Sequence, residues 1–160
     1  MALDPTSMIN GFTSMFQNGA LGIQPGAAKM ASIYASYAAT GMFGASAPVF
    51  TGLEQELLAT TLAAVFGLQV PNPTAFGTAW QTGLLAFWLT PPIVVTGVQS
   101  GLVTSIVGTT ALPAALAALF AVPSNPAPVA ASLLATALHV CTLTTIATVA
   151  PPPSTLVSIL

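Results

Sequence analysis

After Glu56, the remaining 104 residues of this chain contain no Asp, Glu, Lys or Arg. The chain of 160 residues carries one basic side chain, Lys29, and three acidic ones, Asp4, Glu54 and Glu56. Charged residues make up 2% of the sequence, against about 25% in an ordinary globular domain. Because a water-exposed monomer depends on charge to stay dispersed, its surface must consist of small uncharged side chains or be covered by another molecule.

The scarcity of charge also excludes several classes of function. One lysine cannot form the basic patch that binds nucleic-acid phosphates or anionic lipid. A single cysteine, Cys141, excludes an intrachain disulfide. With His139 as the only histidine, no metal site can be assembled without symmetry, and we expect no cofactor. The first residues, MALDPTSMINGF, lack the positive region and apolar core of a secretory signal.

A lipid environment is the alternative to a protein-covered surface, because the chain is 54% hydrophobic with a mean hydropathy of +0.88. Three windows, 82–98, 102–122 and 129–150, have about the length of a membrane span. The first contains Pro91 and Pro92, which interrupt a helix. No loop after Lys29 has a positive charge to set an orientation. A membrane protein of three or four spans, such as a small pore or a holin-like factor, is therefore the alternative interpretation.

Capping residues and prolines predict six helices along the chain. They are expected at about 4–18, 25–41, 51–66, 72–90, 112–121 and 125–142. The extended run IVVTGVQSGLVTSIVG and the two tail segments around the prolines 151–153 are rich in β-branched residues and predict strands. We therefore expect an α+β fold in a single domain, 1–160, with a helical N-terminal half and strands in the C-terminal half. Proline-rich linkers are expected near 123–128 and 151–153, and no repeat of fixed period is visible.

The side chains that could carry chemistry are few. His139 lies two residues before Cys141 near the end of a predicted helix, where the two would not share a face. A Cys/His nucleophile pair is conceivable, but no acid follows Glu56 to orient the histidine, so a buried structural role is favoured. Glu54 fits a capping box with Thr51, and Glu56 points elsewhere. We expect no enzymatic activity and no catalytic residues.

Two segments are candidates for contact with other protein subunits. The first is the aromatic face of the fourth helix, with Phe76, Trp80, Phe87 and Trp88 at helical spacing. The second is the uncharged C-terminal strand, with Thr155, Leu156, Val157, Ile159 and Leu160, which could add to a neighbour's sheet. The alternatives are that the aromatic residues fill the core and that the strand joins the chain's own sheet.

Three segments carry a family resemblance: SMINGFTSMF, AWQTGLLAFWLTPPIVV and TVAPPPSTLVSIL. They resemble small, nearly uncharged virion proteins of contractile-tailed bacteriophages, among the tail and baseplate components. The resemblance implies a structural subunit of the virion that is buried between other protein subunits, which would be further copies or other virion proteins. It carries over no catalytic residue, cofactor or nucleic-acid partner.

Overall fold

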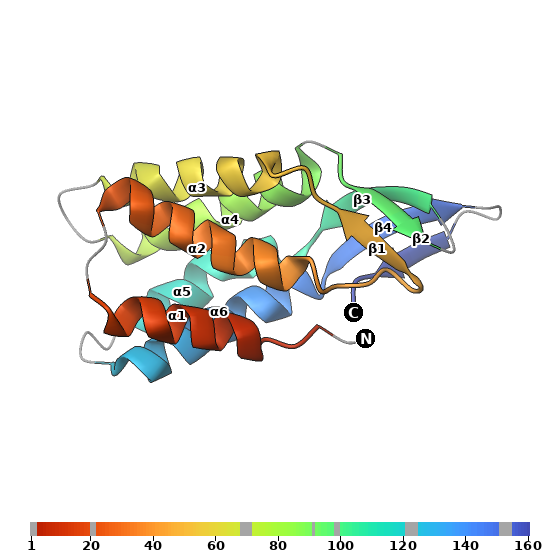
Figure 1. The fold of residues 1–160 in the computed structure, drawn as a ribbon. Helices are drawn as coiled ribbons and strands as arrows, with labels where there is room; N and C mark the ends of the chain where they lie inside the picture. The colour runs from red at the N-terminus through yellow and green to blue at the C-terminus, as the bar shows by residue number, and fades with distance from the viewer. Residues whose placement is uncertain are drawn as a thin grey trace.

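The computed structural model describes residues 3–19, 22–67, 72–90, 92–97, 100–120, 125–150 and 155–160. In these residues the helices gather at one end of the molecule and the strands at the other (Figure 1). The α+β expectation is confirmed, with four of the five strands in the C-terminal half and β1 in the N-terminal half. The helices are α1 (Thr6–Gln17), α2 (Ile23–Ala38), α3 (Leu53–Phe66), α4 (Pro73–Leu89), the short 3₁₀ helix η1 (Gly108–Ala111), α5 (Leu112–Phe120) and α6 (Ala127–Thr142).

The strands form one antiparallel sheet in chain order, β1-β2-β3-β4-β5. They are β1 (Ser46–Val49), β2 (Val94–Gly97), β3 (Ser100–Ile106), β4 (Thr145–Ala150) and β5 (Thr155–Ser158). The two edges of this sheet meet just before β1, because Phe43 bridges both Ser46 and Ile159. Met42 and Leu160 also exchange two backbone hydrogen bonds, of 3.0 and 2.9 Å. The end of the chain is therefore joined to the segment that precedes the first strand.

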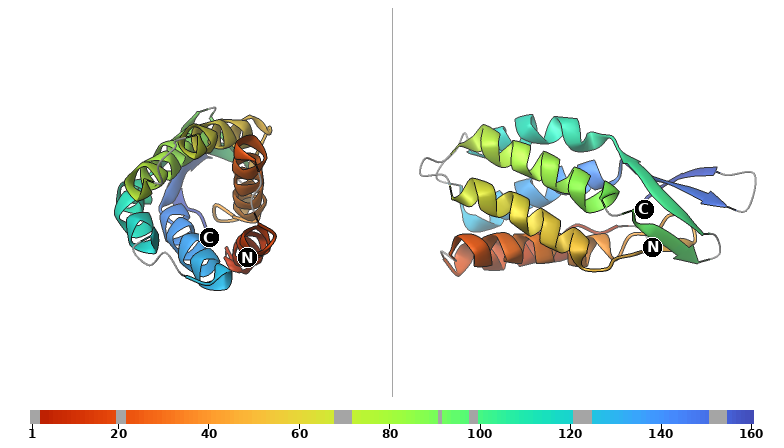
Figure 2. Two further views of the ribbon diagram at one scale, coloured as in Figure 1. Left: turned by 90° about the vertical axis from the view of Figure 1, so that its left-hand side faces the viewer. Right: turned by 90° about the horizontal axis from the view of Figure 1, so that it is seen from above.

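The helices form a ring when the molecule is viewed along its length (Figure 2, left). Each helix from α1 to α6 packs against the next, and α6 packs against α1 to close the ring. The buried side chains form one cluster with members from all six helices and from the strands. The largest fully buried side chains are mainly aromatic, whereas the described large hydrophobic side chains that are exposed are all Ile, Leu or Val.

The order of elements repeats three times, although the sequence shows no obvious repeat. Each unit is a pair of antiparallel helices followed by one or two strands, and its second helix is α2, α4 or α6. These helices begin at residues 23, 73 and 127, that is, 50 and then 54 residues apart. Buried positions recur at the same offsets, so that Tyr34, Leu84 and Leu138 are equivalent. The unequal spacing and the different side chains hide this repeat from a search for a fixed period.

Side-chain hydrogen bonds of predicted capping residues accompany three of the six described α-helix starts, those of α1, α3 and α4. Asp4 accepts hydrogen bonds from the backbone nitrogen and hydroxyl of Thr6. The Asn72 side chain accepts from the backbone nitrogen of Ala75, as an N-cap should. Asn125 is different, because its amide donates to the carbonyl of Leu119 and α6 has no side-chain cap. The second helix begins at Ile23, two residues earlier than expected, with Pro25 in its first turn where a missing N–H costs nothing.

Each of the three apolar windows that could span a bilayer by length is divided between helix and strand. Window 82–98 holds the end of α4 and β2, window 102–122 holds β3 and α5, and window 129–150 holds α6 and β4. Among the described residues, no helix combines the length and apolarity that crossing a membrane requires. Residues 123–124 and 151–153 of the two expected linkers lie outside the described residues, and the rest of the first linker leads into α6.

Candidate functional site: uncharged apolar surfaces

The aromatic face of α4 lies in the core, so the prediction that it forms an interface is corrected. Trp80, Phe87 and Trp88 are fully buried, and Phe76 is 8% exposed. Since α4 packs between α3 and α5 in the ring, its most apolar face points toward the other helices. Trp80 meets Phe12 of α1 edge-on at 6.4 Å between ring centroids. These aromatic rings therefore stabilise the fold and offer no surface to another subunit.

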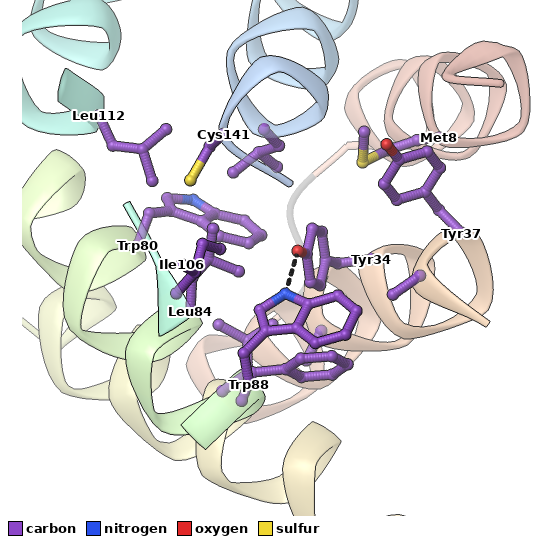
Figure 3. Close-up of a cluster of buried hydrophobic side chains, with 14 of the residues drawn as sticks. Met8, Tyr34, Tyr37, Trp80, Leu84, Trp88, Ile106, Leu112 and Cys141 are labelled. Carbon is purple, nitrogen blue, oxygen red and sulfur yellow. Dashed lines mark hydrogen bonds between the residues drawn. The ribbon is translucent and has the colours of Figure 1, made fainter. Parts of the chain in front are cut away.

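A buried hydrogen-bond chain joins the three helix pairs at the end near the sheet, and Figure 3 shows its bond between Trp88 and Tyr34. The indole Nε1 of Trp88 donates to the hydroxyl of Tyr34 at 2.8 Å. The Tyr34 hydroxyl lies 2.8 Å from Oγ1 of Thr142, which itself donates to the carbonyl of Leu138. Because the Thr142 proton is used there, Tyr34 must donate to Thr142. One residue from each repeat unit thus takes part in a chain of hydrogen bonds in which every donor and acceptor is assigned. Burial raises the pKa of Tyr34, so its hydroxyl keeps the proton that it donates.

The C-terminal strand belongs to the chain's own sheet, as the alternative interpretation expected. β5 pairs with β4 along its length, and Ile159 is fully buried against Gly41, where an added Cβ would overlap its side chain. Val157 is half-buried, and the Thr155 side chain lies outside the described part of the structure. Leu156 and Leu160 remain 73% and 56% exposed. Of the predicted interface residues, these two are the ones that lie open to a neighbour.

His139 and Cys141 do not form a nucleophile pair. Nδ1 of His139 lies 2.6 Å from the hydroxyl of Tyr37, whose burial raises its pKa so that it remains a donor. Burial lowers the pKa of His139 and raises that of the Cys141 thiol to about 12. A thiol with that pKa has almost no thiolate at neutral pH and is a poor nucleophile. In the part of the chain that the structure describes, no cluster of His, Cys, Asp and Glu could hold a metal.

The four formally charged side chains lie before or within the first three helices. Glu54 is buried and accepts hydrogen bonds from the backbone nitrogens of Thr51 and Gly52, which is the glutamate half of the predicted capping box. The N-cap is Gly52, and the Thr51 hydroxyl accepts from the backbone nitrogen of Leu53 at 3.4 Å. Lys29 on α2 and Glu56 on α3 are exposed. The outer sides of α4, α5, α6 and the strands β2 to β5 therefore present no formal charge.

A hollow of about 520 Å³ lies at the end of the ring far from the sheet. It is lined by Met15, Phe16, Gly19, Gly22, Ile23, Gly26 and Phe66. None of these residues has a titratable or nucleophilic side chain. The hollow could take up an apolar group, but its lining supplies no group for catalysis.

Exposed apolar side chains form two ordered rows that sequence reasoning missed. One crosses the outer face of the sheet in strict register, and the other runs along the outside of α6. The first row is Val49, Val94, Leu102 and Leu156, with the half-buried Thr148 between Leu102 and Leu156. The second is Val129, Leu133, Val140 and Leu143, with the exposed Thr136 at its centre. The spacing of the second row, alternately four and three residues, is visible in the sequence, but the other side of the helix is apolar too, so the sequence does not show which side is exposed. The first needed the strand register, which the sequence does not provide.

Comparison of the chain with protein-family models, with curated proteins and with solved structures gives no match.

Proposed function

We propose that this protein is a non-enzymatic structural subunit that is buried between neighbouring subunits of a large protein assembly. A bacteriophage virion, in its tail or baseplate, is the assembly that the sequence resemblance favours. The observation that carries the proposal is the ordered, uncharged and apolar outer surface on α6 and across the sheet.

Exposure of such a surface to water is unfavourable in free energy. Fourteen large apolar side chains of the described residues are at least about one-third exposed, and two groups of them are aligned rather than scattered. Aligned apolar patches on soluble proteins mark contact sites, whereas single exposed side chains are ordinary. Burying a surface without charges requires no desolvation of ions, so subunits can associate at little cost. Interfaces of permanent complexes resemble a protein core that has been divided in two.

The interior supports a structural role as well. Several of its polar side chains connect helices: Tyr34 bonds to Trp88 and to Thr142, and Tyr37 bonds to His139. Glu54 is fully engaged as a helix cap. No described carboxylate, histidine and nucleophile converge in a hollow where a substrate could bind.

Sedimentation velocity of the purified full chain, with and without mild detergent, tests the proposal. We expect the chain to remain in aqueous buffer without detergent, either dissolved or as defined oligomers, over a range of concentrations. Its far-ultraviolet circular dichroism should contain both helix and strand. Protein that leaves the buffer unless detergent is present, and that partitions with vesicles, would contradict the proposal and favour the membrane alternative.

A further inference from the structure

The outer side of α6 carries a seam of five exposed residues that has the spacing of a coiled-coil contact line. The residues are Val129, Leu133, Thr136, Val140 and Leu143, separated by four, three, four and three positions. The four apolar members are 39–59% exposed, and Thr136 is exposed. The opposite side of the same helix is fully buried at Ala131, Leu134 and Leu138. One side of α6 thus faces the core, and the seam is a second apolar side that remains uncovered when the chain folds.

We propose that this seam is the docking site for a second copy of the chain, with the two α6 helices antiparallel about a twofold axis at Thr136. The inference rests on the proposed function, since it names the surface and the partner through which that assembly begins.

The order of side chains along the seam favours a second copy over an unrelated partner. In an antiparallel pair centred on Thr136, Val129 faces Leu143 of the other copy, because each lies seven residues from the axis. Leu133 and Val140 lie three and four residues from the axis, so these two meet with an offset of one residue, about 1.5 Å. Each apolar layer then combines one Val and one Leu, so that all four layers have equal volume. The only hydroxyl meets its own counterpart, and each can donate to the other. A twofold contact requires that one patch be complementary to itself, and this sequence of side chains meets that condition.

The electrostatics of this side of the molecule are also compatible with self-association. The exposed charges, Asp4, Lys29 and Glu56, lie before α1 or on α2 and α3. No formally charged residue lies on α5 or α6. The field of Asp4 reaches α6 at His139, so like-charge repulsion between two copies on this side is limited to that carboxylate. The seam offers nothing that would favour a basic or an acidic partner. A second copy supplies the same uncharged surface.

The area that a stable dimer needs is a small share of the surface of this chain. From Val129 to Leu143 the seam is about 21 Å long at 1.5 Å per residue. A standard interface covers about 800 Å² on each partner, which is about a tenth of the 7741 Å² accessible surface. Beside α6, helix α5 exposes the small residues Ala114, Ala115 and Ala118, which allow a second copy to approach closely. A contact of that size would take in the outer sides of both α5 and α6, two of the six helices of the ring.

A charge at the centre of the seam tests the contact. In the Thr136→Asp variant two carboxylates would face each other across the twofold axis. We expect the dimer dissociation constant from sedimentation velocity to rise at least about tenfold, since like charges that meet at an interface oppose association. Thr82→Asp is the matched control, because Thr82 is an exposed threonine in the middle of α4. Its dissociation constant should stay within about threefold of the unmodified chain.

Disulfide trapping tests the antiparallel geometry and does not depend on the charge variant. Thr136→Cys should form a covalent dimer under mild oxidation, because only this seam position faces itself. Leu133→Cys should not, but a mixture of Leu133→Cys and Val140→Cys chains should cross-link. The native Cys141 is 2% exposed and gives little background.

The outcomes separate the seam from the proposed function. If Thr136→Asp associates as tightly as the unmodified chain, or if Thr136→Cys cross-links no faster than Thr82→Cys, the seam is not the contact. A chain that is monomeric at every concentration also overturns the seam. The proposed function fails on a different result, namely a requirement for detergent.

Discussion

The Tyr34 hydroxyl connects the three helix pairs, and its removal gives the most direct test of how the interior is built. In Tyr34→Phe the ring and its packing remain, but Trp88 loses its acceptor and Thr142 loses a donor. Each lost hydrogen bond costs about 1 kcal/mol, and an indole N–H left buried without a partner costs about 1–3 kcal/mol. Because all three side chains are fully buried, water has no path to replace the hydroxyl. We expect the free energy of unfolding to fall by about 2–4 kcal/mol.

Urea unfolding followed by tryptophan fluorescence measures this loss at a fixed protein concentration, so that self-association contributes equally to each variant. Tyr37→Phe is the matched control. It removes one hydroxyl of the same helix, but the partner, His139, is only half-buried and can bond to water. Its loss should be about 1 kcal/mol. Equal losses for the two variants, or a Tyr34→Phe loss below about 1 kcal/mol, would refute the argument that a fully buried chain of hydrogen bonds joins the helices.

Three further predictions follow from single contacts. A Cβ on Gly77 would lie 2.6 Å from Cα of Pro113. Gly77→Ala should therefore lower the free energy of unfolding by about 1–3 kcal/mol, as measured by urea unfolding. Gly67→Ala is the control and should show no comparable loss, because the nearest atoms to its Cβ are 3.7 Å away. Cys141 should react with iodoacetamide at pH 8 at least about a hundredfold more slowly in the native chain than in urea, because burial raises its pKa to about 12; equal rates would contradict its burial. Burial lowers the pKa of His139 below its ordinary value, so the unfolded chain binds more protons in mildly acidic solution, and stability should fall as the pH drops from 7.5 toward 5. His139→Gln should flatten that profile in urea titrations, and an unchanged slope would assign the effect to other groups.

Much of the local structure could be predicted from the sequence because the signals are local. Asn72 caps the start of α4, and the Pro91-Pro92 pair in the sequence prevents the helix from extending further. The bounds of α4 could therefore be predicted from nearby residues alone. The capping box at Thr51 and Glu54 is equally self-contained. The strands after α4 and in the tail could be expected from their β-branched residues. β1 could not, because Ser46–Val49 is short, contains a proline, and is a strand only through its pairing with β2.

The direction of each helix face was harder to predict, and there the sequence was misleading. Most of α4 is apolar, so its spacing did not show whether the aromatic face pointed inward or outward. The ring decides this, because α4 lies between α3 and α5 and its largest side chains fill the interior. The seam on α6 was overlooked for a related reason. With apolar residues on both sides of that helix, only the packed structure distinguishes the covered side from the exposed one.

By itself, the sequence determined the chemical character of the protein. It required an almost uncharged surface, excluded a basic patch and a disulfide, and placed most helix ends through caps and prolines. The tertiary structure decided which residues share that surface and which share the core. The meeting of Tyr34, Trp88 and Thr142, and the bridge from Phe43 to Ile159, join residues that are far apart in the chain. Such contacts depend on how the helices and strands pack together, and no short segment of sequence encodes that.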